Sequence, residues 1–164
     1  MTTTTSDKLL VLVPIDFSET SRRALAWAFD YATRAPCEVH LLHVIDDQWF
    51  EAVRSRLPDH IAKEISDVNQ ESAAELERMV PDKEDREEIG RILRHVGRGR
   101  PAAEILRIAE KLGADMIVMG THGRSGLAHL LIGSVAEKVV RHANCPVVCV
   151  KPGLVKANGQ APQV

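Results

Sequence analysis

Short apolar runs and helical apolar spacings alternate along this chain. The first run, Leu9–Val13, is continuous, as expected of a strand that is covered on both faces. After Pro14–Asp16, Ser18 is a candidate N-cap, and apolar residues at helical spacing predict a helix over about residues 19–34. Val39–Ile45 is a second apolar strand. The chain therefore begins as strand, helix, strand.

The alternation continues to the last strand. The further predicted elements are an amphipathic helix from Ile61 to Met79, stopped by Pro81; a strand over Ile89–Val96; a helix that Gly97 and Pro101 introduce and Gly113 ends; a strand over Met116–Met119; a helix from Ser134 to about Asn144; and a strand over Val147–Val150, opened by Pro146. The strand over Ile89–Val96 is more polar than the others, so we expect it at a sheet edge. Asp46–Asp59 and Asp82–Glu88 are expected to be connections.

Five strands that alternate with helices favour an α/β fold. The expected architecture is an open, five-stranded parallel sheet with helices on both faces, which makes three layers. No internal repeat and no second domain is evident, so residues 9–151 are expected to form one domain, with flexible tails at 1–8 and 152–164.

Composition narrows the range of functions. The 164 residues carry 21 basic and 23 acidic side chains, a formal charge of −2 with neutral histidines, so no excess of positive charge indicates a nucleic-acid partner. No signal-peptide pattern and no apolar run long enough to span a membrane is evident, and the expected location is the cytoplasm. Three cysteines suggest neither a disulfide framework nor a zinc site. The arginines at 91, 94, 98 and 100 follow an acidic stretch without interleaved aromatics, which favours a solvated, mutually neutralising surface.

The glycine-rich segment after the fourth strand carries the candidate chemistry. Gly120, Gly123 and Gly133 precede Ser134, with nine residues between the second and third glycines. Ligands of open α/β sheets bind beyond the carboxyl ends of the strands. Glycines let backbone amides approach an anion closely, and the first turn of a helix favours phosphate. The segment is neither a Walker A loop, since it lacks the Gly-Lys-Ser/Thr ending, nor the dinucleotide fingerprint that follows a first strand.

Simpler structural roles remain open for the same residues. Gly120 and Gly123 are compatible with turns alone, and Gly133 with close helix packing. Ser134 and Glu137 have the spacing of a capping box, which would compete for the serine hydroxyl.

Asp16 and Arg124 also have more than one possible role. Asp16 is compatible with capping the first helix jointly with Ser18, and Arg124 either pairs with a phosphate or is solvated. His122 and His129 do not supply the convergent ligands of a metal site.

The spacing Gly-x2-Gly-x9-Gly-Ser resembles that of the universal stress protein family. Asp115–Met119 before the motif, Val135 and Cys145–Val148 after it, and Val13–Ser18 at the first strand extend the resemblance over nearly the whole domain. The resemblance implies an adenine nucleotide alpha hydrolase-like fold with strand order 3-2-1-4-5. It also implies the ATP-binding branch of the family and a homodimer formed through Val147–Val150.

The resemblance further implies which residues bind the nucleotide. Asp16 and the backbone near Pro14, Ile15 and Val44 would face the adenosine; Met119 and Gly120 would lie along the nucleotide; and Gly123, Gly133, Ser134 and Val135 would hold the phosphates, with Arg124 beside them. Magnesium or manganese would be held through the phosphates, without protein side chains as ligands.

We expect a nucleotide-dependent signalling module of the stress response without strong catalytic activity. No nucleophile, base and orienting residue are evident together. The alternative is a slow ATPase or phosphotransferase, for which Asp16, His122 and Arg124 are the nearby candidates. AMP or a cyclic nucleotide is an open alternative to ATP as the ligand.

Overall fold

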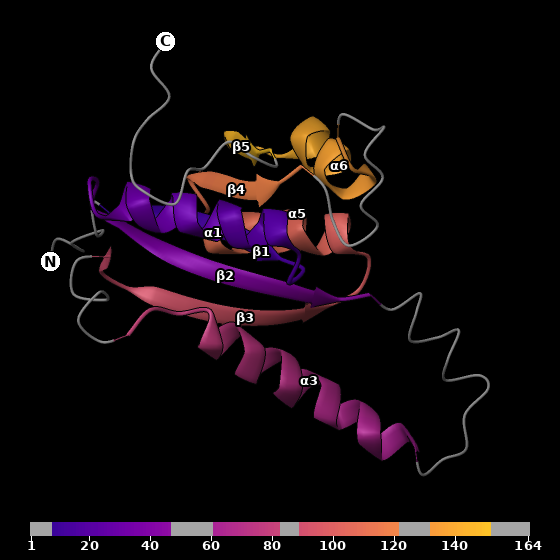
Figure 1. Cartoon of the computed structure of the whole chain (residues 1–164). Coiled ribbons are helices and arrows are strands. Elements are labelled where there is room, and N and C mark those ends of the chain that lie inside the picture. The colour runs from indigo at the N-terminus through magenta and orange to yellow at the C-terminus, as the bar shows by residue number, and fades with distance from the viewer. Residues whose placement is uncertain (1–7, 47–60, 83–88, 122–131, 152–164) are drawn as a thin grey trace, which may run out of the picture.

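A computed structural model describes residues 8–46, 61–82, 89–121 and 132–151 of the chain. Within them, one parallel sheet has the order β3-β2-β1-β4-β5, with helices on both of its faces (Figure 1). The elements are β1 (Leu9–Ile15), α1 (Glu19–Ala32), β2 (Cys37–Ile45), α3 (Ile61–Arg78), β3 (Ile92–Arg98), α5 (Pro101–Leu112), β4 (Met116–Gly120), α6 (Ser134–His142) and β5 (Val147–Val150). The predicted fold class and strand order are confirmed.

The continuous apolar run of β1 is explained by two hydrophobic clusters, one on each face of the sheet. Val11 and Val13 pack with residues of α1 and α3, whereas Leu12 packs with residues of α5 and α6. All three side chains are fully buried. Figure 1 shows α1 in front of the sheet and α5 behind it. Successive strand residues point to opposite faces, so a strand covered on both sides needs apolar residues at every position.

Two helix-terminus predictions hold. Ser18 caps α1, since its hydroxyl accepts a hydrogen bond from the Ser21 amide at 3.2 Å. Pro101 lies in the first turn of α5, and Gly113 ends that helix in the left-handed conformation, with φ 66°.

The third strand begins later than predicted. Ile89 is helical and buried, and Gly90, with φ 88°, separates it from β3, which starts at Ile92. Gly97 lies inside β3 rather than at the turn, which falls instead at Gly99, with φ 135°. Apolar character alone did not distinguish a buried residue before the strand from the strand itself. The edge position expected of this strand is confirmed.

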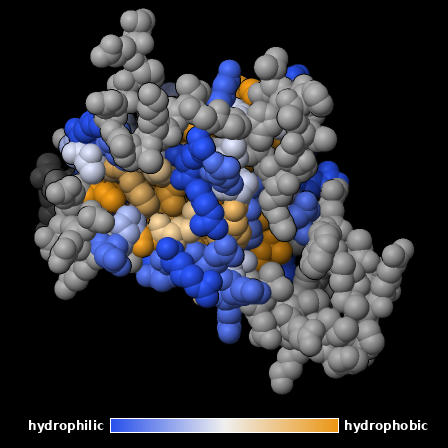
Figure 2. All heavy atoms as spheres, viewed as in Figure 1, coloured by the Kyte–Doolittle hydropathy of each residue, from blue (hydrophilic) through white to orange (hydrophobic). Residues whose placement is uncertain are grey.

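The surface on the α1 side carries both hydrophilic and apolar residues. In Figure 2, a band of hydrophilic residues crosses the described surface and interrupts the apolar side chains on either side of it. Two of the arginines expected on a neutralised surface have acidic partners: Arg91 lies 3.4 Å from Glu38, and Arg94 pairs with Glu77. Among the described helices, none combines the length and apolar character that crossing a bilayer requires.

A pair of histidines joins β2 and β3: His40 is buried, and His95 is partly buried. The His40 and His95 rings stack with centroids 5.1 Å apart, and His40 Nδ1 lies 2.9 Å from His95 Nε2. One nitrogen must donate and the other accept, so this contact is incompatible with two imidazolium ions. His40 Nε2 is buried without a hydrogen bond among the described residues; Glu38 Oε2, at 3.6 Å, is too distant to accept one.

Both histidines favour the neutral form in the folded protein. Burial, and then the neighbouring His95, lower the pKa of His40, while Glu38 acts in the opposite direction. Burial, and then Lys111, lower the pKa of His95. The unfolded chain therefore takes up protons first as the pH falls. The contribution of the pair to stability is complete above the unfolded pKa of about 6.5 and is lost as the pH falls from there towards the lowered folded values.

We predict that the free energy of unfolding falls between pH 7 and pH 5 by less than about 1.4 kcal/mol per pH unit for each histidine. The variant with His40→Leu and His95→Leu should lose less stability over the same range, because neither site can then be protonated. Urea unfolding at a series of pH values measures both slopes. Equal slopes for the two proteins would contradict the prediction.

Candidate functional site

The carboxyl ends of β1 and β4 separate from each other. Their pairing covers Val11–Leu12 against Met116–Ile117, although β1 continues to Ile15 and β4 to Gly120. β1 is followed by β2 on one side of the sheet and has β4 on the other, so the strand order changes direction here. This is the position at which open α/β sheets bind ligands.

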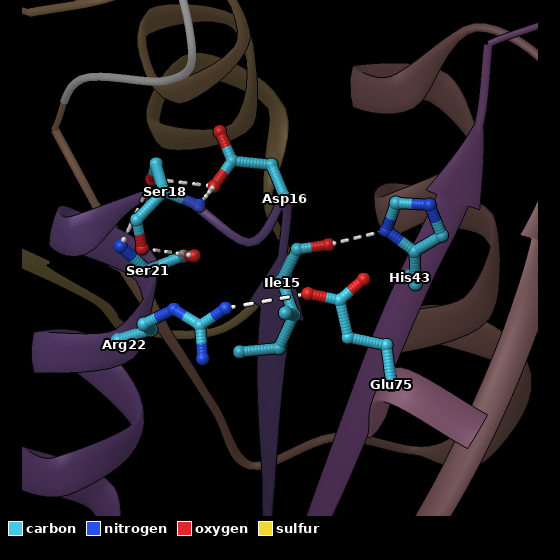
Figure 3. A network of polar contacts seen from close by, with 7 residues as sticks. All are labelled: Ile15, Asp16, Ser18, Ser21, Arg22, His43 and Glu75. Carbon is cyan, nitrogen blue, oxygen red and sulfur yellow. Dashed lines mark hydrogen bonds and ion pairs between the residues drawn. The ribbon is translucent and has the colours of Figure 1, made fainter. Parts of the chain in front are cut away.

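The turn that follows β1 holds Asp16 by its side chain. One carboxylate oxygen, Oδ1, accepts hydrogen bonds from the Ser18 amide at 3.0 Å and from the Ser18 hydroxyl at 2.5 Å (Figure 3). Because that hydroxyl donates to Asp16, it must accept from Thr20 Oγ1, which lies 3.0 Å away. Asp16 therefore orients the residue that caps α1, while its second oxygen accepts no hydrogen bond from the described residues.

Figure 3 also shows the link between α1 and α3. Arg22 Nη2 lies 3.3 Å from Glu75 Oε1, and the two side chains are about half and one-third exposed. An ion pair this exposed contributes little to stability.

The last helix begins without a side-chain cap. Gly133 is its N-cap, in an extended conformation, and Ser134 is the first helical residue. The predicted start of α6 at Ser134 is confirmed, and the alternative of a capping box does not apply: Ser134 lies one position too far along the helix to act as the cap, and Glu137 pairs with Arg141 at 2.8 Å. The Ser134 side chain is exposed.

The first-turn amides of α6 contrast with those of α1. In α1 the Ser18 hydroxyl accepts from the amide of Ser21, whereas the amides of Ser134, Val135 and Ala136 have no hydrogen bond within the described part of the chain. Three backbone donors and the positive end of the helix dipole coincide at this point. Such an arrangement favours an anion.

Thr121 holds the two ends of the glycine-rich segment together. Its carbonyl accepts a hydrogen bond from the Gly133 amide at 2.6 Å, and its own amide donates to the Val150 carbonyl at 3.0 Å. Its side chain is buried, with the hydroxyl 3.4 Å from the same Val150 carbonyl. The end of β4, the end of β5 and the start of α6 are thereby joined. Sequence reasoning missed this residue; its signal was a small polar side chain directly after a buried strand.

Gly120 is required by packing. A Cβ at this position would lie 2.9 Å from the carbonyl carbon, Cβ and Oγ1 of Thr20 in the first turn of α1. The simple role considered for Gly120 was a turn; the structure shows instead a close approach to α1, which brings the end of β4 against the cap of that helix.

The candidate binding residues that the structure describes lie along the carboxyl ends of the parallel strands. Those at the ends of strands or at the start of α6 are Pro14, Ile15, Asp16, Val44, Met119, Gly120, Gly133, Ser134 and Val135. Gly123, Arg124, His122 and His129 lie outside the described residues. In the part of the chain that the structure describes, no group of three or more histidine, cysteine or acidic side chains is arranged to hold a metal ion.

Comparison with known proteins finds similarity over most of the chain. Residues 10–151 match the model of the universal stress protein family. The chain is 36% identical to universal stress protein MJ0531 of Methanocaldococcus jannaschii over 143 residues, which cover 86% of this chain and 81% of that protein.

Solved structures share the fold. That of the hypothetical protein MJ0577 is 35% identical, with a TM-score of 0.74 over 87% of this chain and 95% of the other. The universal stress protein from Archaeoglobus fulgidus in complex with dAMP is 24% identical, with a TM-score of 0.55 over 88% of this chain and 98% of that one.

We predict that Gly120→Ala lowers the free energy of unfolding by about 1–3 kcal/mol, because the added Cβ meets the backbone of α1. Gly97→Ala is the matched control: its Cβ would lie as close, 2.9 Å, to Glu104, but to the movable end of a side chain. Urea unfolding of both variants measures the difference. An equal or larger loss for Gly97→Ala would contradict the account of Gly120.

Proposed function

Since this chain belongs to the universal stress protein family, we propose that it binds ATP where β1 and β4 separate, with the phosphates at the start of α6. The observation that carries the proposal is the uncapped first turn of α6. This helix of nine residues has no side-chain acceptor for its first amides among the described residues, and phosphate oxygens suit them.

The phosphate half of the proposed site combines backbone donors with one hydroxyl. The amides of Ser134 and Val135 and the exposed Ser134 hydroxyl would donate to phosphate oxygens. Gly133 has no side chain to obstruct the approach. Gly123 and Arg124 are assigned to the same half, as the glycine spacing and a charge beside the phosphates suggest. Magnesium or manganese would be held by the phosphates.

The adenosine half is assigned to the turn after β1 and its neighbours. Asp16 has a carboxylate oxygen to offer, and the backbone of Pro14, Ile15 and Val44 lies at the same edge of the sheet, with Met119 and Gly120 at the end of β4 between the two halves. A family member of the same fold was solved in complex with dAMP. An adenine nucleotide is therefore the ligand class that we propose, with ATP as the first candidate.

We propose binding and signalling in the stress response, in the cytoplasm, rather than rapid turnover. Phosphoryl transfer needs an oriented base and charge clamps. The Asp16 carboxylate already accepts two hydrogen bonds from Ser18, so one of its oxygens is committed to the turn. A purified protein that hydrolysed bound ATP within minutes would favour the slow-enzyme alternative.

We predict that mass spectrometry of ligand released from the purified protein identifies an adenine nucleotide, and that Gly123→Val weakens ATP binding at least about tenfold, because a branched side chain blocks the approach of phosphate. Isothermal titration calorimetry measures the affinity. Gly97→Ala, in β3, is the control and should bind as the wild type does. A folded Gly123→Val protein with unchanged affinity would show that the phosphates are misplaced.

We further propose that the chain forms a homodimer through β5. This strand pairs with β4 only, among the described elements. The hydrogen bonds from Ile117 to Pro146 and from Thr121 to Val150 show that alternate residues of β5 face β4. In a parallel ladder the intervening residues, Val147 and Cys149, then direct their backbone groups to the open edge. An edge of this kind is suited to pairing with a second copy.

We predict that Cys149→Pro yields a monomer in sedimentation velocity, because proline removes an outward amide without removing a hydrogen bond to β4. Cys149→Ala, which keeps that amide, should remain dimeric, and this control also excludes a disulfide as the link. A monomeric wild type, or a dimeric Cys149→Pro variant, would count against the proposed interface.

A further inference from the structure

Phe17 has an unusual backbone conformation next to Asp16. Its φ is 63°, and it is the one residue other than glycine with a positive φ within the described ranges. A bulky side chain is strained in this region, so neighbouring contacts must hold it there. Two residues, Asp16 and Phe17, separate the end of β1 from the cap of α1, so this conformation sets the path of the turn.

The contacts that hold this turn come from His43 on β2. Its ring lies against the Phe17 ring, with centroids 4.5 Å apart and planes inclined by 36°. Its Nδ1 lies 2.7 Å from the Ile15 carbonyl oxygen, as Figure 3 shows. A carbonyl only accepts, so Nδ1 carries the proton. One side chain thus contacts the residues before and after Asp16.

The hydrogen bond from His43 to the Ile15 carbonyl fixes the orientation of the whole Ile15–Asp16 peptide group. The Ile15–Asp16 peptide is trans and planar, so its carbonyl and the Asp16 amide point in opposite directions. His43 therefore determines the orientation of the peptide that enters Asp16, and its contact with Phe17 supports the conformation that follows. On the other side of the turn, Ser18 holds Asp16 Oδ1. Together these contacts fix the direction of the second oxygen.

We propose that His43 is a positioning residue of the nucleotide site, which aims the Asp16 carboxylate at the nucleoside and so sets the preference for adenosine over other nucleosides. The proposal rests on the proposed function, in which Asp16 faces the adenosine. His43 itself contacts the turn rather than the ligand, so its effect should fall on recognition of the base and leave phosphate binding unaffected.

The first test uses the nucleotide-free protein and is independent of ATP binding. Side-chain ¹⁵N shifts should report the Nδ1-protonated tautomer of neutral His43. In His43→Phe, which keeps a ring but no donor, the Ser18 amide should exchange with solvent about fivefold to tenfold faster, because its acceptor Asp16 moves. His43→Asn, whose side-chain amide replaces the Nδ1 donor, should restore slow exchange. The Nε2-protonated tautomer, or unchanged exchange in His43→Phe, would overturn the proposal.

The second test measures affinities for ATP, GTP and inorganic tripolyphosphate by calorimetry. His43→Phe should weaken ATP binding about tenfold and reduce the preference for ATP over GTP, with tripolyphosphate changed less than about twofold. His43→Asn should recover most of the ATP affinity. The matched control is His142→Phe, which replaces an exposed histidine at the far end of α6 and should behave as the wild type.

The outcomes separate the two proposals. Equal weakening of ATP and tripolyphosphate in His43→Phe would indicate a general structural role and overturn the positioning role, as would unchanged affinity for ATP. A wild-type protein that binds no nucleotide would overturn the proposed function, and the tautomer and exchange measurements would then decide by themselves whether His43 holds the turn.

Discussion

The hydrogen bond from the Gly133 amide to the Thr121 carbonyl determines where the last helix begins. Thr121 is in turn joined to the end of β5, and Gly120 before it lies against the first turn of α1. The start of α6 is thereby held at the end of β4, and with an extended glycine at the cap position, no side chain of the described residues accepts from its first amides. The positive end of the α6 dipole, with its open amides, therefore lies at the point where β1 and β4 separate.

The turn after β1 and the start of α6 differ in how many of their polar groups have hydrogen-bond partners. The turn after β1 is held by its own contacts and leaves one carboxylate oxygen of Asp16 open among the described residues: Ser18 caps α1, Asp16 orients Ser18, and His43 holds the Ile15 carbonyl. The start of α6 has no such acceptor among the described residues. A preformed, rigid half beside a half with open backbone donors suits a ligand that has a flat group to be recognised and a charged group to be held.

The sequence predicted the sheet well and the polar contacts poorly. Apolar runs such as Leu9–Val13 and Val147–Val150 identified strands, and the first ends in three residues that are fully buried in a sheet covered on both faces. The start of β3 was missed, because Ile89 is buried before the strand rather than in it. The start of α6 at Ser134 was predicted correctly, but the alternative of a capping box with Glu137 does not apply, since serine spacing does not reveal the conformation of the preceding glycine. Contacts between distant segments, such as those of His43, leave no periodic signal.

The most direct measurement of the central claim is a titration of the ¹⁵N-labelled protein with ATP, in which backbone amide shifts are followed. The amides of Ser134, Val135 and Ala136 should shift saturably and together, because phosphate oxygens become their acceptors, while the amide of Ser21, which already donates to Ser18, should change little. Saturable binding of ATP that leaves the three α6 amides unshifted would contradict the account.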